Sequence, residues 1–342
     1  MIKRILVIFT VVAGIGFTSC ETEFSLNGEY VETPVIFGLL DHLDSIHYIK
    51  ITKAFLGDGD NLVYAKTPDS NYFKQVDAQI VEFDDGEETG RYWDLRDTII
   101  KTKSTDGLFY APEQKVYIFR AADLDPELEY RLTGDINEGK LKINSTTTLI
   151  SGFDISNTVK LPTYKFRFAN NSDDPDDRYN RAVKFDVYEG MNAKEYEVGY
   201  TIAWSEFYTD GSSSTFSAYR KDDIYQQTRP ESPSVFFALF NGEEFYKWVG
   251  ETVPDDPKVE RRTLDRIDIN ISVAHANLSQ YIAVTKPVSS IAQVKPEFTN
   301  IENGYGLFSS RIRFVKSAIE LDLNSLEELC SGRYTATKLF CE

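Results

Sequence analysis

The sequence predicts a mainly β protein, with an N-terminal β-sandwich of immunoglobulin or fibronectin type followed by a β-rich domain with a few short helices. Two observations favour this class. About seven short polar–apolar alternations, separated by Gly, Asp or Pro, occupy roughly 110 residues of the first half. Hydrophobic residues make up 42% of the 342 residues, including 23 Phe and 20 Tyr, which supplies the core of a folded protein.

The first half carries the clearest strand patterns. Residues 48–55 (YIKITKAF) and 76–83 (VDAQIVEF) alternate polar and apolar side chains, and the turn-forming stretch DDGEETG follows the second of them. Residues 128–149 predict a hairpin that turns around Asn137-Glu138-Gly139. No Cys…Trp…Cys core is present, so the sequence excludes an antibody-like domain proper.

The second half mixes strands with helices. A turn-rich stretch at 150–160 predicts the boundary, giving a signal peptide at 1–19, a sandwich domain at 20–155 and a β-rich domain at 156–342. Residues 259–275 alternate as a strand.

Three segments of the second half are predicted helices. Residues 234–253 place aromatic side chains near helical spacing, and residues 277–286 precede Pro287. Residues 324–332 begin at Asn324, whose type and spacing from Glu327 suit a capping box.

The amino end has the pattern of a secretory signal peptide. Lys3 and Arg4 precede the apolar segment 5–17, and small residues lead to Cys20. An apolar helix of this length rises only about 20 Å, which is too short for a hydrocarbon core of ~30 Å. We therefore expect export and no transmembrane anchor in this segment.

The residues before Cys20 resemble the lipobox of bacterial lipoproteins, with Phe17 at the third position back and Thr18-Ser19 adjacent to the cysteine. The resemblance implies cleavage before Cys20 and lipidation at that residue. Several acyl chains anchor a protein stably, whereas one chain holds it only marginally. The alternative is an ordinary secreted protein in which Cys20 merely lies near the cleavage site.

The net charge excludes one class of partner, and the cysteines predict one covalent cross-link. The net charge of -17 argues against nucleic acid, which requires clustered Lys and Arg. Cys330 and Cys341, eleven residues apart in a chain predicted to be exported, favour a disulfide that fixes the carboxyl terminus.

Candidate ligand sites are few. Trp93, Trp204 and Trp248 are candidates for stacking on sugar rings, although core packing is the more common role of such residues. The loop NNSDDPDD offers a weak calcium candidate with four carboxylates: Asp173, Asp174, Asp176 and Asp177. His42 and His47 lack a third zinc ligand, and no nucleophile motif lies near His275, so we predict no metal, no cofactor and no enzymatic activity.

The stretch KPEFTNIENGYGLFSSRIRF (295–314) carries the most specific pattern. Its members Asn300, Gly304, Gly306 and Phe308 resemble the late motif of a Bacteroidota outer-membrane lipoprotein family of unknown function. Many members of that family are encoded beside TonB-dependent receptors. The motif predicts a tight turn whose apolar residues, including Tyr305, either pack into the core or form a loop for a ligand or partner.

The sequence thus favours a lipid-anchored outer-membrane lipoprotein with a binding or accessory role. The resemblance implies a TonB-dependent transporter as partner and the outer membrane as location. A surface glycan-binding or adhesin lipoprotein is the alternative, and a hydrolase of envelope polymers is a third class, which would require converging acids in a pocket.

Overall fold

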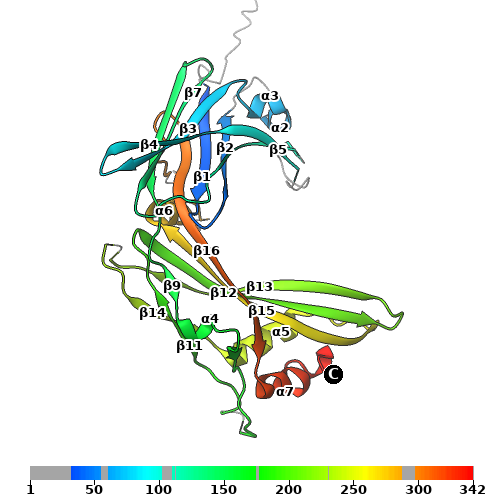
Figure 1. Ribbon diagram of the computed structural model, residues 1–342. Coiled ribbons are helices and arrows are strands. Elements are labelled where there is room, and N and C mark those ends of the chain that lie inside the picture. Colours follow the sequence, from blue (N-terminus) through cyan, green and yellow to red (C-terminus); the bar gives the residue numbers. More distant parts are fainter. Residues whose placement is uncertain are drawn as a thin grey trace, which may run out of the picture.

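The computed structural model describes residues 32–54, 61–101, 110–111, 113–174, 177–229, 231–286 and 297–341. Strands dominate these residues and the helices are short, which confirms the predicted mainly β fold class (Figure 1). Buried side chains form two hydrophobic clusters. The first takes its members from residues 36–149 together with Ile301 and Phe308, and the second takes its members from residues 150–340.

The first half is a β-sandwich. Its strands are β1 (Thr33–Leu40), β2 (Ile46–Ala54), β3 (Val76–Asp84), β4 (Glu87–Asp94), β5 (Arg96–Ile100), β6 (Gln114–Arg120), β7 (Glu129–Ile136) and β8 (Leu141–Thr148). One layer has the order β1-β2-β6-β5 and the other β4-β3-β7-β8. Lettered along the chain, these are the A-B-E-D and C′-C-F-G layers of an immunoglobulin-type sandwich. Two short helices, α2 (Asn61–Ala65) and α3 (Pro68–Asn71), lie between β2 and β3 in the chain.

Alternation along the strands builds the sandwich core. Ile49 and Ile51 of β2 face Ile80 of β3 and other residues of the opposite layer, and all three are fully buried. The predicted β7–β8 hairpin is confirmed: its turn residues 137–139 all have positive φ. The β3–β4 hairpin turns at Asp85-Gly86, also with positive φ, as a two-residue turn of this composition requires.

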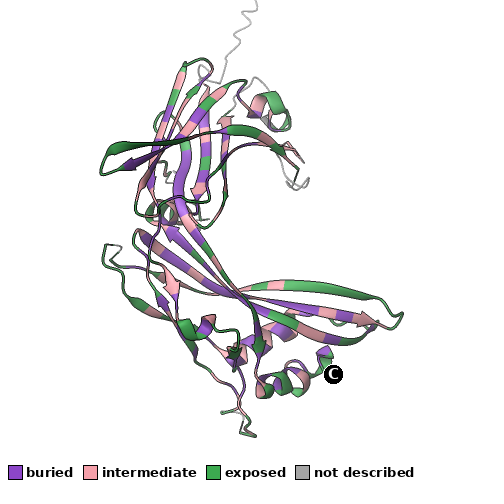
Figure 2. Cartoon of the chain, in the orientation of Figure 1, coloured by how far each residue is buried: buried purple, intermediate pink, exposed green. Residues whose placement is uncertain are grey.

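The second half is built on a sheet of long strands. They are β12 (Ala193–Tyr208), β13 (Ser213–Gln226), β15 (Val259–His275) and β16 (Tyr305–Leu321), in the order β13-β12-β15-β16. One face carries buried residues such as Tyr200 and Ile269. Figure 2 shows how much of β13 remains exposed.

Smaller elements cover the buried face of that sheet. The strands β9 (Asp154–Ile155), β11 (Val183–Tyr188) and β14 (Val235–Phe240) form a three-stranded sheet, and β10 (Lys165–Phe166) pairs with β16. The helices of this layer are α4 (Asn157–Lys160), α5 (Gly242–Thr252) and α7 (Leu323–Ser331), and the 3-10 helix η1 (Ala336–Lys338) follows α7. Phe245 of α5 and Leu329 of α7 join the same core as the long strands. The helix α6 (Ala276–Thr285) is not part of this core and packs through Tyr281 against Phe37 of β1.

Two helix predictions need correction. The predicted helix 234–253 is wrong in its first part, because residues 235–240 form β14 and only 242–252 are helical. Ala238 and Phe240 are buried at alternate positions, as in a strand, because β14 pairs with β11. Pairing with this distant strand outweighs the helical spacing of the aromatic residues in the local sequence. The last helix is capped by Asp322, not by the predicted Asn324: the Asp322 side chain accepts from the backbone N–H of Ser325.

β16 joins the two halves. Its residues 305–310 run parallel to β1 in the sandwich, and its residues 311–319 run antiparallel to β15 in the second half (Figure 1). The sandwich layer and the long-stranded sheet are therefore one continuous hydrogen-bonded sheet. A single division of the sequence at 155/156 separates residues 297–310 from the sandwich core that they complete.

Candidate functional site

The motif residues close one edge of the sandwich. The Asn300 side chain accepts from the backbone N–H of Phe308 at 2.9 Å and donates to the carbonyl of the same residue at 2.6 Å. The backbone of Asn300 in turn accepts from Ser145 Oγ of β8 at 2.7 Å. Residues 300–308 therefore bridge β1 in one layer and β8 in the other.

The two glycines permit close backbone contact at this edge. Gly306 has φ +112°, and a Cβ there would lie 1.9 Å from the carbonyl oxygen of Ile36. A Cβ on Gly304 would lie 2.9 Å from the carbonyl oxygen of Pro34. Phe308 is fully buried, whereas Tyr305 is 51% exposed. Within the predicted ligand or partner loop, these positions serve packing, and Tyr305 remains at the surface.

A large surface cavity lies on the outer face of the β4-β3-β7-β8 layer, beside the motif; we call it the sheet groove. Its volume is about 750 Å³. The residues that line it are Val76, Asp77, Ala78, Gln79, Asp94, Leu95, Thr133, Gly134, Asp135, Lys142, Ile143, Asn144, Glu302 and Asn303. The last two belong to the motif, so the structure brings part of the motif to the rim of this cavity.

Strand register aligns the polar side chains of the sheet groove in rows. Gln79 pairs with Asp94 on one side and with Thr133 on the other, and Thr133 pairs with Asn144. An isolated bridge from Asn144 to Glu302 extends this row to the motif. Residues opposite one another in a sheet share a face, so the five side chains form one transverse row.

Hydrogen-bond acceptors predominate in the sheet groove. In the second row, Asp77 lies opposite Asp135, a like-charge pair that is unfavourable in isolation. Lys142 opposite Asp135 is the one basic residue among the lining residues. The Oδ1 atom of Asn144 is buried without a hydrogen-bond partner. The groove is therefore suited to a ligand that donates hydrogen bonds through hydroxyl or ammonium groups.

The sequence did not single out the groove residues, with the exception of Glu302 and Asn303, which lie in the quoted motif. Asp77, Gln79, Thr133 and Asn144 occupy the outward positions of separate strands, where polar residues are ordinary. The sequence marks them only as polar residues at alternate positions of a strand. Sheet pairing alone brings them together.

The three tryptophans do not form an exposed row. Trp204 is 4% exposed and belongs to the second core, where Trp248 packs at its edge. Trp93 packs at the edge of the first core, with Arg91 over its ring at 5.0 Å from the ring centroid. Trp204 is buried and Trp93 and Trp248 are half-buried, so the three indoles pack against two different cores and do not share one exposed surface.

The acidic loop gives no support to the calcium candidate. Asp173, Asp174 and Asp177 are described, whereas Asp176 lies outside the described residues. No group of three or more His, Cys, Asp or Glu side chains in the described part of the chain is arranged to hold a metal ion.

Two of the histidines, His47 and His275, have structural partners. His47 is buried, stacks on Phe119 and lies with Nε2 2.9 Å from the carbonyl oxygen of Ala121. His275 caps α6, and its ring lies within hydrogen-bond distance of Thr148 Oγ1 and close to Ser309 Oγ. Ser309 is fully buried, which denies a substrate access to that hydroxyl.

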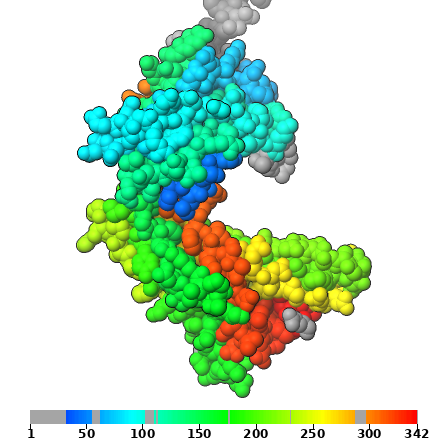
Figure 3. Space-filling view, viewed as in Figure 1, coloured from blue at the N-terminus to red at the C-terminus, as the bar shows by residue number. Residues whose placement is uncertain are grey.

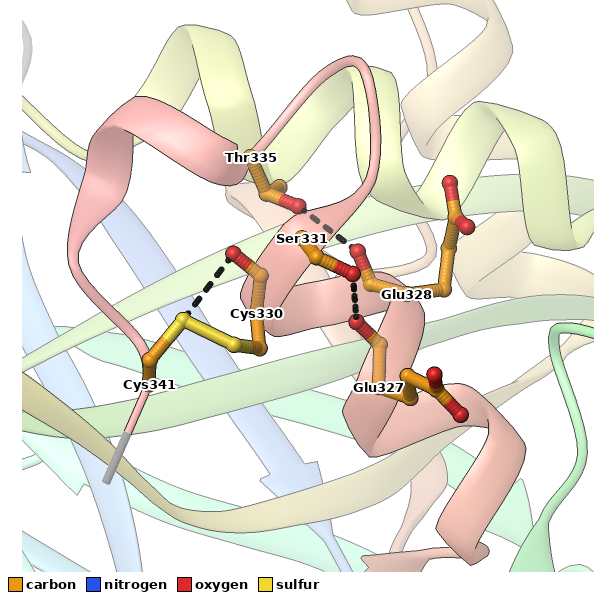
Figure 4. Close-up of a disulfide and its surroundings, with 6 residues drawn as sticks. All are labelled: Glu327, Glu328, Cys330, Ser331, Thr335 and Cys341. Carbon is orange, nitrogen blue, oxygen red and sulfur yellow. Dashed lines mark hydrogen bonds between the residues drawn. A yellow bond between two sulfur atoms is a disulfide. The ribbon is translucent and has the colours of Figure 1, made fainter.

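A disulfide and a buried ion pair fix the carboxyl terminus. Cys330 and Cys341 form the predicted bond, and their Cα atoms are 4.6 Å apart (Figure 4). The hydroxyls of Ser331 and Thr335 donate to carbonyls in the last turn of α7. Arg262, 1% exposed, donates from Nη1 to the carbonyl of Lys338 at 2.9 Å.

Arg262 pairs with a buried acid. Its Nε donates to Glu206 Oε1 at 2.8 Å. Burial by itself would raise the pKa of Glu206, but the hydrogen bonds from Arg262, Trp204 and Tyr208 lower it below its usual value. The pair is fully partnered and serves the fold.

Cys20 lies outside the described residues, so the lipidation site has no structural description. None of the helices in the described ranges has the length and apolar character needed to cross a membrane. No protein-family model matches the chain, and no curated protein matches it either.

Proposed function

We propose that the protein is a lipid-anchored lipoprotein of the outer membrane that acts as a binding or accessory module, held through Cys20. The leader carries this proposal: a basic start, a short apolar segment and small residues before Cys20 together fit export and lipidation.

The direction of β1 supports an arrangement on the membrane. Its last residue, Leu40, pairs with Ser310, beyond which β16 enters the second half. Its first residue, Thr33, therefore lies at the end of the sandwich remote from the second half (Figure 1). A tether at the amino end puts the sandwich next to the membrane and the long-stranded sheet farther out.

The sheet groove supplies the binding surface in this proposal. It lies on the membrane-proximal sandwich and offers carboxylates and amides to a ligand or partner that donates hydrogen bonds. The family resemblance suggests a TonB-dependent transporter as that partner.

The decisive test is the fate of Cys20. Intact-mass analysis of the protein from its native host is expected to find a chain that begins at Cys20 and carries acyl groups, recovered with the outer membrane. Cys20→Ser is expected to leave the protein unacylated and to shift it out of the membrane fraction. An unacylated wild-type chain, or one released into the medium, would overturn the anchor.

The partner is tested separately by cross-linking in intact cells. Recovery of a receptor-sized barrel protein with the wild type, and its loss with Gln79→Ala, is the expected result. Cross-linking that Gln79→Ala leaves unchanged would remove the groove from the contact. If neither the wild type nor Gln79→Ala is cross-linked to a barrel protein, the proposed association with a transporter is contradicted.

A glycan ligand is the second candidate, favoured by one feature of the same face. Tyr92 of β4 is 61% exposed and lies two residues before Asp94, so both side chains are on the outer side of the layer. An aromatic ring beside a row of amides and carboxylates suits a sugar. Binding of soluble envelope polysaccharide that Tyr92→Ala weakens and Tyr188→Ala does not would support it. Equal binding by both variants would exclude it.

A further inference from the structure

The strands β1, β2 and β16 come together near the junction of the two halves (Figure 1). A second cavity, which we call the junction pocket, is lined by residues of these strands and of the β1–β2 connection. It measures about 410 Å³. Arg311 and Arg313 of β16 line one side, and Phe37, Leu39 and Tyr48 contribute apolar surface from β1 and β2. In a chain of net charge -17, paired arginines in a pocket are unusual.

Arg311 forms no ion pair with a carboxylate among the described residues, although the charges of Asp41 and Asp44 lie near it. Its side chain is half-buried, and its Nε atom is buried without a hydrogen-bond partner. Burial, followed by repulsion from Arg313, lowers the pKa of Arg311 below its ordinary value, and the weaker attraction of Asp41 and Asp44 only partly opposes this. A partly dehydrated guanidinium of this kind is stabilised by an anion on its remaining N–H groups.

The two nearby carboxylates have other partners, and one of them, Asp44, itself lines the pocket. Both carboxylate oxygens of Asp41 accept backbone N–H bonds, one from Leu43 at 3.1 Å and one from Arg313 at 2.9 Å. Asp44 pairs with the guanidinium of Arg313 at 3.4 Å. Neither acid forms an ion pair with Arg311 among the described residues, so the position beside its guanidinium is open to an external anion.

The walls indicate which anion fits. Phe37 is 36% exposed, with its ring packed edge-on against Tyr281 of α6, and Tyr48 is 51% exposed. Inorganic ions gain nothing from such surfaces, whereas an organic acid buries apolar area against them. We propose that the junction pocket binds a small organic carboxylate, with its charged group on Arg311 and its apolar part against Phe37, Leu39 and Tyr48.

The test uses simple probes on the whole mature chain in detergent. Titration calorimetry with benzoate is expected to give saturable 1:1 binding, weaker binding of acetate, and none of benzamide, which has the same ring without the charge. Arg311→Gln is expected to weaken benzoate binding about tenfold or more, because a charged hydrogen bond is lost. The control Lys316→Gln removes the same charge from the same strand outside the pocket and is expected to leave affinity unchanged.

A second variant keeps the test decisive if Arg311→Gln fails to fold. Tyr48→Ala changes an exposed wall residue, and it is expected to weaken benzoate but not acetate. Several results would overturn the proposal: no benzoate binding, equal binding of benzamide, or an effect of Lys316→Gln equal to that of Arg311→Gln. Tighter binding of inorganic phosphate than of benzoate would also overturn it, since the apolar walls would then have no role.

Discussion

At the scale of the residue, Gly306 shows how one position limits the fold. We expect Gly306→Ala to lower the free energy of unfolding by about 2 kcal/mol or more, because the new Cβ meets the Ile36 carbonyl and the backbone holds a positive φ. Urea unfolding followed by circular dichroism measures the loss.

Gly139 provides the matched control for this substitution. It also has a positive φ, but a Cβ there has nothing within 4 Å. Gly139→Ala should therefore lower the free energy of unfolding by only about 1 kcal/mol, the cost of holding a residue with a Cβ at positive φ. Equal losses for the two variants would show that the close approach of β1 and β16 is unimportant.

His275 makes stability depend on pH. Burial lowers its pKa to about 4. Its Nδ1 accepts the backbone N–H of Asn277, which requires a neutral ring at that atom. Because the unfolded pKa is near 6.5, the unfolded state binds the proton first, and the contribution of His275 is complete above pH ~6.5 and is lost as the pH falls toward ~4.

The expected loss across that window is up to about 3 kcal/mol for this side chain. Carboxylates also titrate there, so the measurement is the difference between wild type and His275→Gln in urea unfolding at several pH values. The variant should show a flatter dependence on pH. A constant difference from pH 7 to pH 4 would contradict the assignment.

At the scale of the element, two different interactions hold the carboxyl-terminal tail: a disulfide and the contacts of Arg262. The disulfide closes a loop of eleven residues, which is worth about 3 kcal/mol by loop entropy. Arg262 holds the carbonyls of Pro254 and Lys338 and the carboxylate of Glu206. These contacts act in the folded state, whereas the disulfide restricts the unfolded chain.

We expect Arg262→Met to lower the free energy of unfolding by about 3–5 kcal/mol, because Glu206 is left buried without its cation. Arg261→Met is the control: its exposed guanidinium lies over Phe207 at 3.7 Å from the ring centroid, which is worth under about 1 kcal/mol. Thermal and urea unfolding compare the two. A loss for Arg262→Met no larger than for Arg261→Met would mean that the pair is dispensable.

At the scale of the whole molecule, β16 makes the two halves interdependent. Together they surround a hollow on one side of the molecule (Figure 3). The sandwich core contains Ile301 and Phe308, which follow the second half in sequence. We expect a fragment of residues 32–149 not to fold alone, since β1 loses its neighbour and the core loses a large aromatic side chain.

The same fragment is expected to fold when residues 297–310 are added after a flexible linker. Dispersed amide signals in NMR spectra report folding in each case. Phe308→Ala within the added segment is the control, and it should cost about 3–5 kcal/mol. Native-like spectra from residues 32–149 by themselves would refute this dependence.

Several elements were predictable because their signal is local. The strands near 48–55, 76–83 and 259–275 and the hairpin at 137–139 follow from alternation and turn residues. The sheet groove was not predictable, because the row through Gln79, Thr133 and Asn144 exists only after three strands pair in one register.

The sequence by itself determined the β class and the pairing of the last two cysteines, since period, composition and spacing are properties of neighbours along the chain. Only the tertiary structure decided that β14 is a strand, that β16 crosses both halves, and that Arg311 lines a pocket without forming an ion pair with a described residue. Each of these depends on pairing between segments far apart in the chain. Local propensity does not specify such partners, because burial and hydrogen bonding across the sheet select them.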